Sequence, residues 1–280
     1  MKSKAQPGFT LLELLIVMAI IGLLSAIILV GYQGQTDKAR LAKTMQWAIS
    51  LNHLLGVNTL GAWTFDRITG TTVYDDSSNK NDGTIYGGAT VVDGVIGKAL
   101  SFDGNDYVNV SNSSNLINYT GLTLEAWIKP SSDGVYGGIF NKYYYPGSCY
   151  LRQFLLRRES SNQICFWMGY NSGANAYVIC TPTANPVLAK DGWIHIVATW
   201  SGQLNTMKIY LNSKVMVSYT GALDWTTNTA CSLEIGRYTG SYYFNGLIDD
   251  VRIFSEALPQ AQIEQFYADG LKTHHPLAQQ

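Results

Sequence analysis

A long apolar run near the N-terminus constrains this chain more strongly than any other feature of its sequence. The run extends from Phe9 to Val30, 22 residues with a single charged side chain, Glu13. As a helix that rises about 1.5 Å per residue, it is long enough to cross the hydrocarbon core of a bilayer. A carboxylate inside that layer costs about 2.5–3.5 kcal/mol on insertion scales. The sequence therefore predicts a transmembrane helix over residues 9–30, and an ordinary membrane anchor with an unusual Glu13 is one interpretation of it.

The segments on either side of the run indicate its orientation and its continuation. The leader MKSKAQPG carries Lys2 and Lys4 and no acidic residue, which favours a cytoplasmic N-terminus. A secretory signal would end its apolar core with a small-residue cleavage site. Here the chain continues into a segment whose apolar side chains recur at spacings of three and four, at Leu41, Met45, Ala48, Leu51 and Leu55. That spacing predicts that one helix extends over residues 9–57.

From Gly61 onwards the sequence has the pattern of an antiparallel β-sandwich. Turn-forming clusters such as DDSSNKNDG, FDGND and KPSSDG alternate with short runs rich in β-branched and aromatic residues, among them GLTLEAWIKP and GWIHIVATW. A short helix is expected to close the domain, because Pro259 precedes a segment in which Ile263, Phe266 and Tyr267 form an apolar side. The predicted fold class is α+β: a long N-terminal helix, the sandwich, the C-terminal helix and a flexible tail over residues 271–280.

The charge composition narrows the classes of partner. Charged residues make up 14% of the chain, and the formal net charge is −1. A nucleic-acid-binding protein would carry a basic patch or stripe, and this sequence has no such run of Lys and Arg. Nucleic acid is therefore not an expected partner.

The start of the apolar run resembles the class III signal of type IV prepilins and pseudopilins. The matching residues are Gly8, Phe9, Thr10, Leu11 and Glu13, directly ahead of the membrane-length helix. The resemblance implies a prepilin leader over residues 1–8, which a prepilin peptidase removes after Gly8, and N-methylation of Phe9 as the new first residue. Residues 9–57 would then form the helical stalk of a pilin-like subunit.

The same resemblance implies a partner for Glu13. In an assembled filament, Glu13 of one subunit would pair with the Phe9 amino group of a neighbour. A carboxylate that is costly alone in lipid is tolerated when it is paired, so this contact would favour assembly and help to set the helix register. The implied partners are other pilin subunits, in a homo- or hetero-filament, and the peptidase. The protein would lie in the inner membrane before assembly and then in a filament that spans the periplasm or extends outside the cell.

The β-rich part resembles a bacterial LamG-like, concanavalin A-like jelly-roll domain. The resemblance rests on AWTFD, GKALSFDGNDYVNV, GLTLEAWIKP, DGWIHIVATW and GLIDDVRIFSEAL, which occur in the order found in that family. It assigns the jelly roll to residues 60–270.

The segment GLIDDVRIF permits two interpretations of a buried carboxylate. With a period of two, one face of this strand holds Leu247, Asp249, Val251 and Ile253, and the other holds Ile248, Asp250, Arg252 and Phe254. If the first face lies in the core, Asp249 needs a partner. Related domains often bind Ca²⁺, so one hypothesis is that Asp249 joins Asp66 or Asp103 at a calcium site. The other is that Asp249 accepts backbone N–H bonds at a corner of the fold.

A histidine in GWIHIVATW is expected to be structural. His195 shares a face with Trp193, Val197 and Thr199 at period two. A lone histidine between Trp and Val predicts a satisfied core residue rather than a functional one.

The four cysteines all lie in the predicted sandwich, at Cys149, Cys165, Cys180 and Cys231. An even number in an exported domain indicates two disulfides, and four cysteines allow three pairings. Four buried thiols are the alternative. With a turn at NSGAN, Cys165 and Cys180 fall opposite one another on adjacent antiparallel strands, which favours this pair and leaves Cys149 with Cys231.

Two tyrosine-rich segments, NKYYYPGS and RYTGSYYFNG, are candidate ligand-binding sites. They contain Tyr143, Tyr144, Tyr145, Tyr238, Tyr242 and Tyr243. Consecutive aromatic residues cannot all face the core of one strand, and Tyr is suited to stacking and hydrogen bonding at recognition surfaces. A glycan or a surface protein would be the ligand. The alternative is that these side chains pack a hairpin or contact a neighbouring pilin.

The sequence offers no signature of catalysis. Glycoside hydrolysis needs two carboxylates across the scissile bond, and the Glu-x-Asp-x-x-Glu run of glycosidases with this fold does not occur. Gly-x-Ser-x-Gly, His-Glu-x-x-His and a P-loop are also missing from the sequence. We therefore expect a structural protein rather than an enzyme.

The favoured function is a pilin-like subunit of a type IV pilus-type filament that displays a LamG-like domain for adhesion or for binding glycans or proteins. The bulk of residues 60–270 favours a minor or tip subunit. A pseudopilin of a type II secretion system is the alternative, and a membrane-anchored carbohydrate-active enzyme is a weaker one.

Overall fold

The computed structural model describes residues 58–112, 116, 120–131, 136–142, 153–170, 175–183, 192–223, 231–238 and 240–274. Contacts divide the chain into two units between Leu55 and Gly56, and all described residues belong to the second unit. We call residues 58–274 the head. The predicted helix over residues 9–57 lies outside the described residues. No helix within the described ranges is long and apolar enough to cross a membrane.

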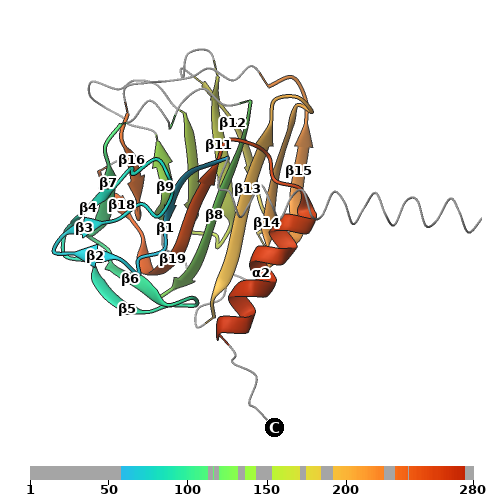
Figure 1. Cartoon of the computed structure of the whole chain (residues 1–280). Coiled ribbons are helices and arrows are strands. Elements are labelled where there is room, and N and C mark those ends of the chain that lie inside the picture. Colours follow the sequence, from blue (N-terminus) through green and yellow to red (C-terminus); the bar gives the residue numbers. More distant parts are fainter. Residues whose placement is uncertain are drawn as a thin grey trace, which may run out of the picture. The chain divides into compact units, whose positions relative to one another are not determined.

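Two antiparallel sheets form the head (Figure 1). In the described part of the chain the first sheet has eight strands, in the order β15-β14-β13-β8-β19-β6-β5, with β1 also paired to β19. Its strands are β1 (Thr59–Trp63), β5 (Thr90–Asp93), β6 (Lys98–Asp103), β8 (Gly121–Pro130), β13 (Ile194–Ser201), β14 (Thr206–Leu211), β15 (Lys214–Thr220) and β19 (Asn245–Phe254).

The second sheet has nine strands among the described residues, in the order β12-β11-β10-β9-β16-β7-β4-β3-β2. Its strands are β2 (Ile68–Thr69), β3 (Thr72–Val73), β4 (Gly83–Tyr86), β7 (Tyr107–Val110), β9 (Gly137–Lys142), β10 (Phe154–Arg158), β11 (Ile164–Tyr170), β12 (Asn175–Cys180) and β16 (Leu233–Ile235). A short hairpin, β17 (Arg237–Tyr238) with β18 (Tyr242–Tyr243), contacts β9.

The hydrophobic core lies between the two sheets and confirms the predicted sandwich. Aromatic side chains from both sheets are buried in one cluster, including Trp63, Phe102, Phe140, Phe166 and Trp200. Along most strands, inward apolar residues alternate with outward polar or aromatic ones, which is the period expected when one face of a strand is buried.

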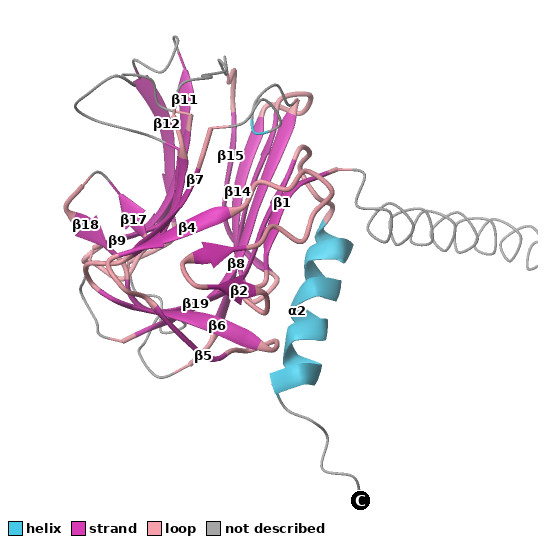
Figure 2. Cartoon of the chain, turned by 60° about the vertical axis from the view of Figure 1, so that its left-hand side comes forward, coloured by secondary structure: helices cyan, strands magenta, loops and turns pink. Residues whose placement is uncertain are grey.

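Helix α2 (Gln260–His274) follows Pro259 and covers the outer side of the eight-stranded sheet (Figure 2). Ile263 and Phe266 are buried in a second apolar cluster with strand residues such as Val197. Tyr267 stacks on Trp127 of β8, with ring centroids 5.7 Å apart. The predicted apolar side of the helix is thus the side that packs on the sheet. The helix continues four residues beyond the expected domain boundary at 270, into the segment predicted to be a flexible tail.

Strand β19 departs from the predicted period of two. Its pairing with β8 passes from Asp249↔Trp127 to Arg252↔Glu125, so Asp250 and Val251 together occupy one position of the ladder. Asp250 has a left-handed backbone with φ of 51°. This β-bulge reverses the alternation, because an extra residue turns all later side chains to the other face. The core therefore receives Ile248, Val251 and Ile253, and the predicted face that joined Asp249 to Val251 was wrong.

Candidate functional site

The outer face of the nine-stranded sheet carries the most distinctive surface of the head. Its strands alternate Ile85 inward with Tyr86 outward, Val108 inward with Tyr107 outward, and Phe166 inward with Trp167 outward. Among the described residues, the only α-helix packs on the other sheet, and β9, β17 and β18 lie on the opposite side of the head from it (Figure 2). Aromatic side chains therefore point away from the core on this side.

The first group on this face, the Arg157 cluster, consists of Tyr136, Arg157, Glu159, Trp167, Tyr238 and Tyr242. The Arg157 guanidinium lies 4.8 Å from the ring centroid of Trp167, 5.0 Å from that of Tyr238 and 5.3 Å from that of Tyr136. It also forms an ion pair with Glu159 at 2.6 Å. The Tyr136 hydroxyl donates a hydrogen bond to the Glu159 carboxylate, and this bond raises the pKa of Tyr136.

The second group, the Arg237 cluster, consists of Tyr86, Tyr107, Glu234, Arg237 and Tyr243. The Arg237 guanidinium lies 3.4 Å from the ring centroid of Tyr107 and 5.9 Å from that of Tyr243. Tyr86 stacks on Tyr107 with a centroid separation of 5.0 Å. Burial alone would lower the pKa of Arg237, but its hydrogen bonds and ion pair with Glu234 outweigh that effect and raise the pKa.

The β17–β18 hairpin brings the two clusters together. Tyr238 pairs with Tyr242 across the hairpin and their rings stack 5.7 Å apart, while Arg237 pairs with Tyr243. Tyr242 also lies 5.5 Å from the ring of Tyr136. Tyr242 belongs to the Arg157 cluster and Tyr243 to the Arg237 cluster, so the two clusters are neighbours on one surface. We call this surface the aromatic–arginine face.

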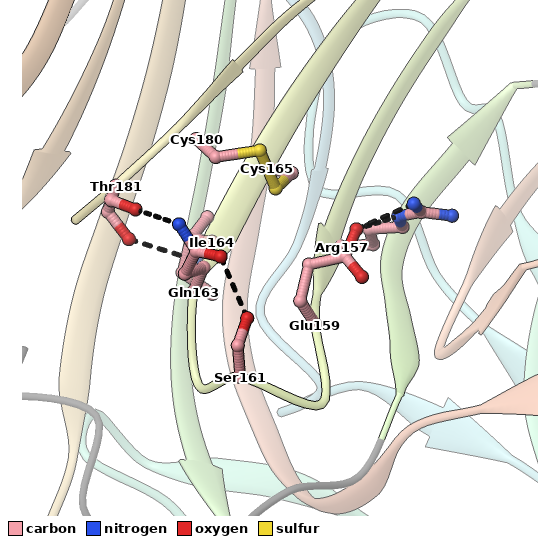
Figure 3. Close-up of a disulfide and its surroundings, with 8 residues drawn as sticks. All are labelled: Arg157, Glu159, Ser161, Gln163, Ile164, Cys165, Cys180 and Thr181. Atoms are coloured by element: carbon pink, nitrogen blue, oxygen red, sulfur yellow. Dashed lines mark hydrogen bonds and ion pairs between the residues drawn. A yellow bond between two sulfur atoms is a disulfide. The ribbon is translucent and has the colours of Figure 1, made fainter. Parts of the chain in front are cut away.

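A disulfide stabilises the sheet beside the Arg157 cluster (Figure 3). Arg157 of β10 stands opposite Cys165 of β11, which stands opposite Cys180 of β12, and the two cysteines are bonded as predicted. Thr181 continues the link, because its Oγ1 accepts the Ile164 amide at 3.1 Å. The disulfide thus joins β12, at the edge of the sheet, to β11, which pairs with the strand of Arg157. Cys231 is also disulfide-bonded, and its predicted partner Cys149 lies outside the described residues.

The structure brings half of the predicted tyrosines into one surface. Tyr238, Tyr242 and Tyr243 all belong to the aromatic–arginine face, whereas Tyr143, Tyr144 and Tyr145 lie outside the described residues. Sequence reasoning missed Tyr86, Tyr107, Tyr136, Arg157, Glu159, Trp167, Glu234 and Arg237. One pattern in the sequence could have found several of them. In a strand whose inward positions are all apolar, an aromatic or charged residue at an outward position is a candidate surface residue.

Asp249 caps the turn between β5 and β6. Its Oδ2 atom accepts the amide N–H of Val95 at 2.7 Å and that of Ile96 at 3.0 Å. A Cβ at Gly94 would overlap this carboxylate, so the approach requires glycine there. Burial raises the pKa of Asp249 to about 7; the amide bonds oppose the rise and repulsion from Asp250 adds to it. The predicted backbone-acceptor role is thus the one observed.

The other two carboxylates predicted for calcium also bind backbone amides. Asp66 Oδ1 accepts the Lys98 amide at 2.8 Å, at the same turn, where Gly97 has φ of 65° and no room for a Cβ. Asp103 instead accepts the Asn105 amide in the turn between β6 and β7. Within the described ranges, no group of three or more His, Cys, Asp or Glu side chains is arranged to hold a metal ion. Calcium binding stays a prediction.

A buried polar network lies between the eight-stranded sheet and α2. Glu125 Oε1 is 3.0 Å from His195 Nε2 and 3.3 Å from Arg252 Nη1, and Arg252 Nη2 donates to Asp250 at 2.7 Å. Burial raises the pKa of Asp250 to about 6, although the Arg252 charge opposes the rise. His195 is fully buried and its Nε2 contacts Glu125, so it is a core residue, as predicted, but its Nδ1 has no hydrogen-bond partner among the described residues. Helix α2 packs on this network, with Tyr267 stacked on His195 and Phe266 against the Arg252 guanidinium.

The predicted processing and assembly residues, Gly8, Phe9 and Glu13, lie outside the described residues.

Comparisons with known proteins identify both parts of the chain. The family model of the concanavalin A-like lectin/glucanases superfamily matches residues 102–264. The chain belongs to this superfamily. A second family model, the prokaryotic N-terminal methylation motif, matches residues 3–29 and confirms the recognised prepilin-type start.

Two curated relatives match different parts of the chain. A fimbrial protein of Moraxella nonliquefaciens is 32% identical over 123 residues, which cover 36% of this chain and 80% of that protein. An adhesion G-protein coupled receptor V1 of Danio rerio is 25% identical over 184 residues, which cover 62% of this chain but only 3% of the receptor. Together with the methylation motif, the fimbrial relative supports a pilin-like subunit with a lectin-like binding domain.

Two solved structures share this fold over about three quarters of the chain. The binding domain of Paraclostridial Mosquitocidal Protein 1 is 18% identical, with a TM-score of 0.61 over 77% of this chain and 53% of that one. Domain 4 of an extracellular arabinanase from Geobacillus stearothermophilus, in complex with arabinotriose, is 20% identical, with a TM-score of 0.55 over 75% of this chain and 98% of that domain. At these identities the likeness concerns the fold.

Proposed function

We propose that the chain is a subunit of a type IV pilus-type filament whose head binds a glycan at the aromatic–arginine face and so acts in adhesion. The observation that carries the proposal is the gathering of seven aromatic side chains and two arginines on one outer sheet face. Aromatic rings supply stacking surfaces and tyrosine hydroxyls supply hydrogen bonds, which is the combination that recognition surfaces use. The arabinotriose complex of domain 4 supports a sugar ligand for a domain of this fold.

The proposal includes processing at the N-terminus. Cleavage after Gly8 and methylation of Phe9 would produce the assembly-competent subunit, with Glu13 paired to a neighbour. N-terminal sequencing of protein extracted from membranes tests this step, and retention of Met1 would refute it. Because the head is bulky, we place it in a minor or tip subunit.

A membrane-anchored glycosidase is disfavoured on this face. The two carboxylates of the aromatic–arginine face, Glu159 and Glu234, are each bound to an arginine, whereas hydrolysis needs one carboxylic acid that can donate a proton. The chain is therefore proposed to bind its ligand without cleaving it.

Electron microscopy with a gold-labelled antibody to the head distinguishes the roles. Labels at filament ends are expected for a tip subunit, and labels along the shaft would indicate a major subunit. Absence of surface label would favour the secretion pseudopilin instead.

Ligand binding is tested by measuring how well cells adhere to a glycan-coated surface. Tyr242→Ala should weaken this adhesion, and Tyr219→Ala is the control variant. Tyr219 is a matched control because it is similarly exposed but lies on β15 of the other sheet. Equal adhesion by the two variants would remove this face from the proposal.

A further inference from the structure

We infer that the ligand of the aromatic–arginine face is an extended, uncharged polysaccharide chain, with the Arg157 and Arg237 clusters as neighbouring sugar subsites. This inference rests on the proposed glycan-binding function and specifies the class of glycan. It follows from the partners of the charged groups and from which atoms remain exposed.

Both arginines of the face are already neutralised. Arg157 is paired with Glu159, and the side chain of each is only 13% exposed. Arg237 is paired with Glu234, and these side chains are 14% and 7% exposed. An anionic sugar would have to displace a carboxylate from its arginine or approach with that carboxylate still in place. Recognition of acidic sugars, in contrast, uses basic groups that are free to form bidentate contacts.

The most exposed residues of the two clusters are tyrosines. Tyr86 is 47% exposed, Tyr136 36% and Tyr242 45%, and they belong to both clusters. The arginines lie against these and neighbouring rings, so their planar groups hold the rings in place rather than presenting charge. A sugar without a charge loses little by desolvation when its apolar face stacks on such a ring.

The contiguity of the clusters indicates a chain rather than a single terminal sugar. Tyr242 and Tyr243 are consecutive, yet one contacts Tyr136 and the other contacts Arg237. A chain that occupies one cluster thus has its next residues near the second. Binding at the second cluster then becomes intramolecular, so affinity should rise with chain length.

The test uses the full-length chain purified in detergent and a panel in which each neutral oligosaccharide is paired with its uronate. Mannan is paired with mannuronate, glucan with glucuronate and galactan with galacturonate, from disaccharides to octasaccharides. We expect a neutral chain to bind, with an affinity at least about tenfold higher for the octasaccharide than for the disaccharide. Affinity should change less than about twofold between low and high salt, since no ion pair forms with the ligand. Tyr242→Ala should lose about tenfold and Tyr219→Ala should match the wild type.

The outcomes separate this inference from the proposed function. Tighter binding of a uronate, weakened strongly by salt, would overturn the inference and leave glycan binding intact. Binding of neutral disaccharides and octasaccharides with equal affinity would overturn the extended-chain part. No binding to any member of the panel would overturn both the inference and the proposed function.

A gain-of-function variant tests the charge argument directly. Glu159→Gln keeps the size of the side chain but releases Arg157 from its ion pair. The variant should acquire salt-sensitive binding of uronate chains that the wild type lacks. Unchanged uronate binding in a variant with wild-type melting temperature would show that pairing of Arg157 does not determine the ligand charge.

Discussion

Asp249 provides the sharpest test of how the head is held together, because its two proposed roles make opposite predictions. The structure places its carboxylate on two amides of the β5–β6 turn, fully buried and with a pKa of about 7. Since the folded-state pKa lies above the ordinary value of 3.8, the folded head binds a proton more tightly than the unfolded chain. This contribution to stability is fully present below pH 3.8 and is lost as pH rises through 7.

The size of the effect follows from the two pKa values. When the pH is raised from 5 to 8, deprotonation of Asp249 should lower the free energy of unfolding by about 3 kcal/mol. Asp249→Asn keeps an oxygen acceptor for the turn but has no charge to bury. The free energy of unfolding of this variant should therefore not show the fall of about 3 kcal/mol. The measurement is a urea titration at pH 5 and at pH 8, followed by tryptophan fluorescence. Between these pH values the urea midpoint of the wild type should fall by about 1 M more than that of Asp249→Asn.

Two controls complete the experiment. Asp249→Ala removes the acceptor of two amides and should cost about 2–6 kcal/mol at pH 5. At pH 8 the cost should be about 3 kcal/mol smaller, because the wild type has by then lost the contribution of the protonated carboxyl. EDTA should leave the wild-type midpoint unchanged. Equal pH dependence of wild type and Asp249→Asn would refute the reasoning from burial. A midpoint that falls with EDTA in the wild type and not in Asp249→Asn would show that the carboxylate is a calcium ligand.

Three further substitutions test the remaining structural claims. Replacing Cys165 and Cys180 together by Ala opens a loop with a sequence separation of 15. The free energy of unfolding, measured by urea titration, should fall by about 3 kcal/mol, and a fall of less than about 1 kcal/mol would contradict this prediction. Glu125→Ala should cost about 3–5 kcal/mol, because it removes the shared partner of a buried imidazole and a guanidinium; a melting temperature within a degree of wild type would exclude this role. Gly97→Ala should cost more than about 1 kcal/mol, whereas Gly192→Ala, which meets no atom within 4 Å, should be neutral in the same thermal scan.

Several features of the head could be predicted from the sequence because they depend on neighbours along the chain. Alternating polarity indicates strands, and the spacing of Ile263, Phe266 and Tyr267 predicted the side of α2 that packs on the sheet. A turn predicted at NSGAN implied the register that places Cys165 opposite Cys180, which the strand pairing confirms. The apolar run with Glu13 likewise indicated the methylation motif.

Other features were decided only by the tertiary structure. The bulge at Asp250 depends on how β19 meets β8, and one extra residue was enough to invert the predicted face. Arg157 and Tyr238 are 81 positions apart in sequence but lie 5.0 Å from guanidinium to ring centroid, because strand order and the hairpin over β9 bring them together. A local pattern reports which face of a strand is buried. It does not report which outward side chains from distant strands become neighbours, and for this protein those neighbours make the candidate site.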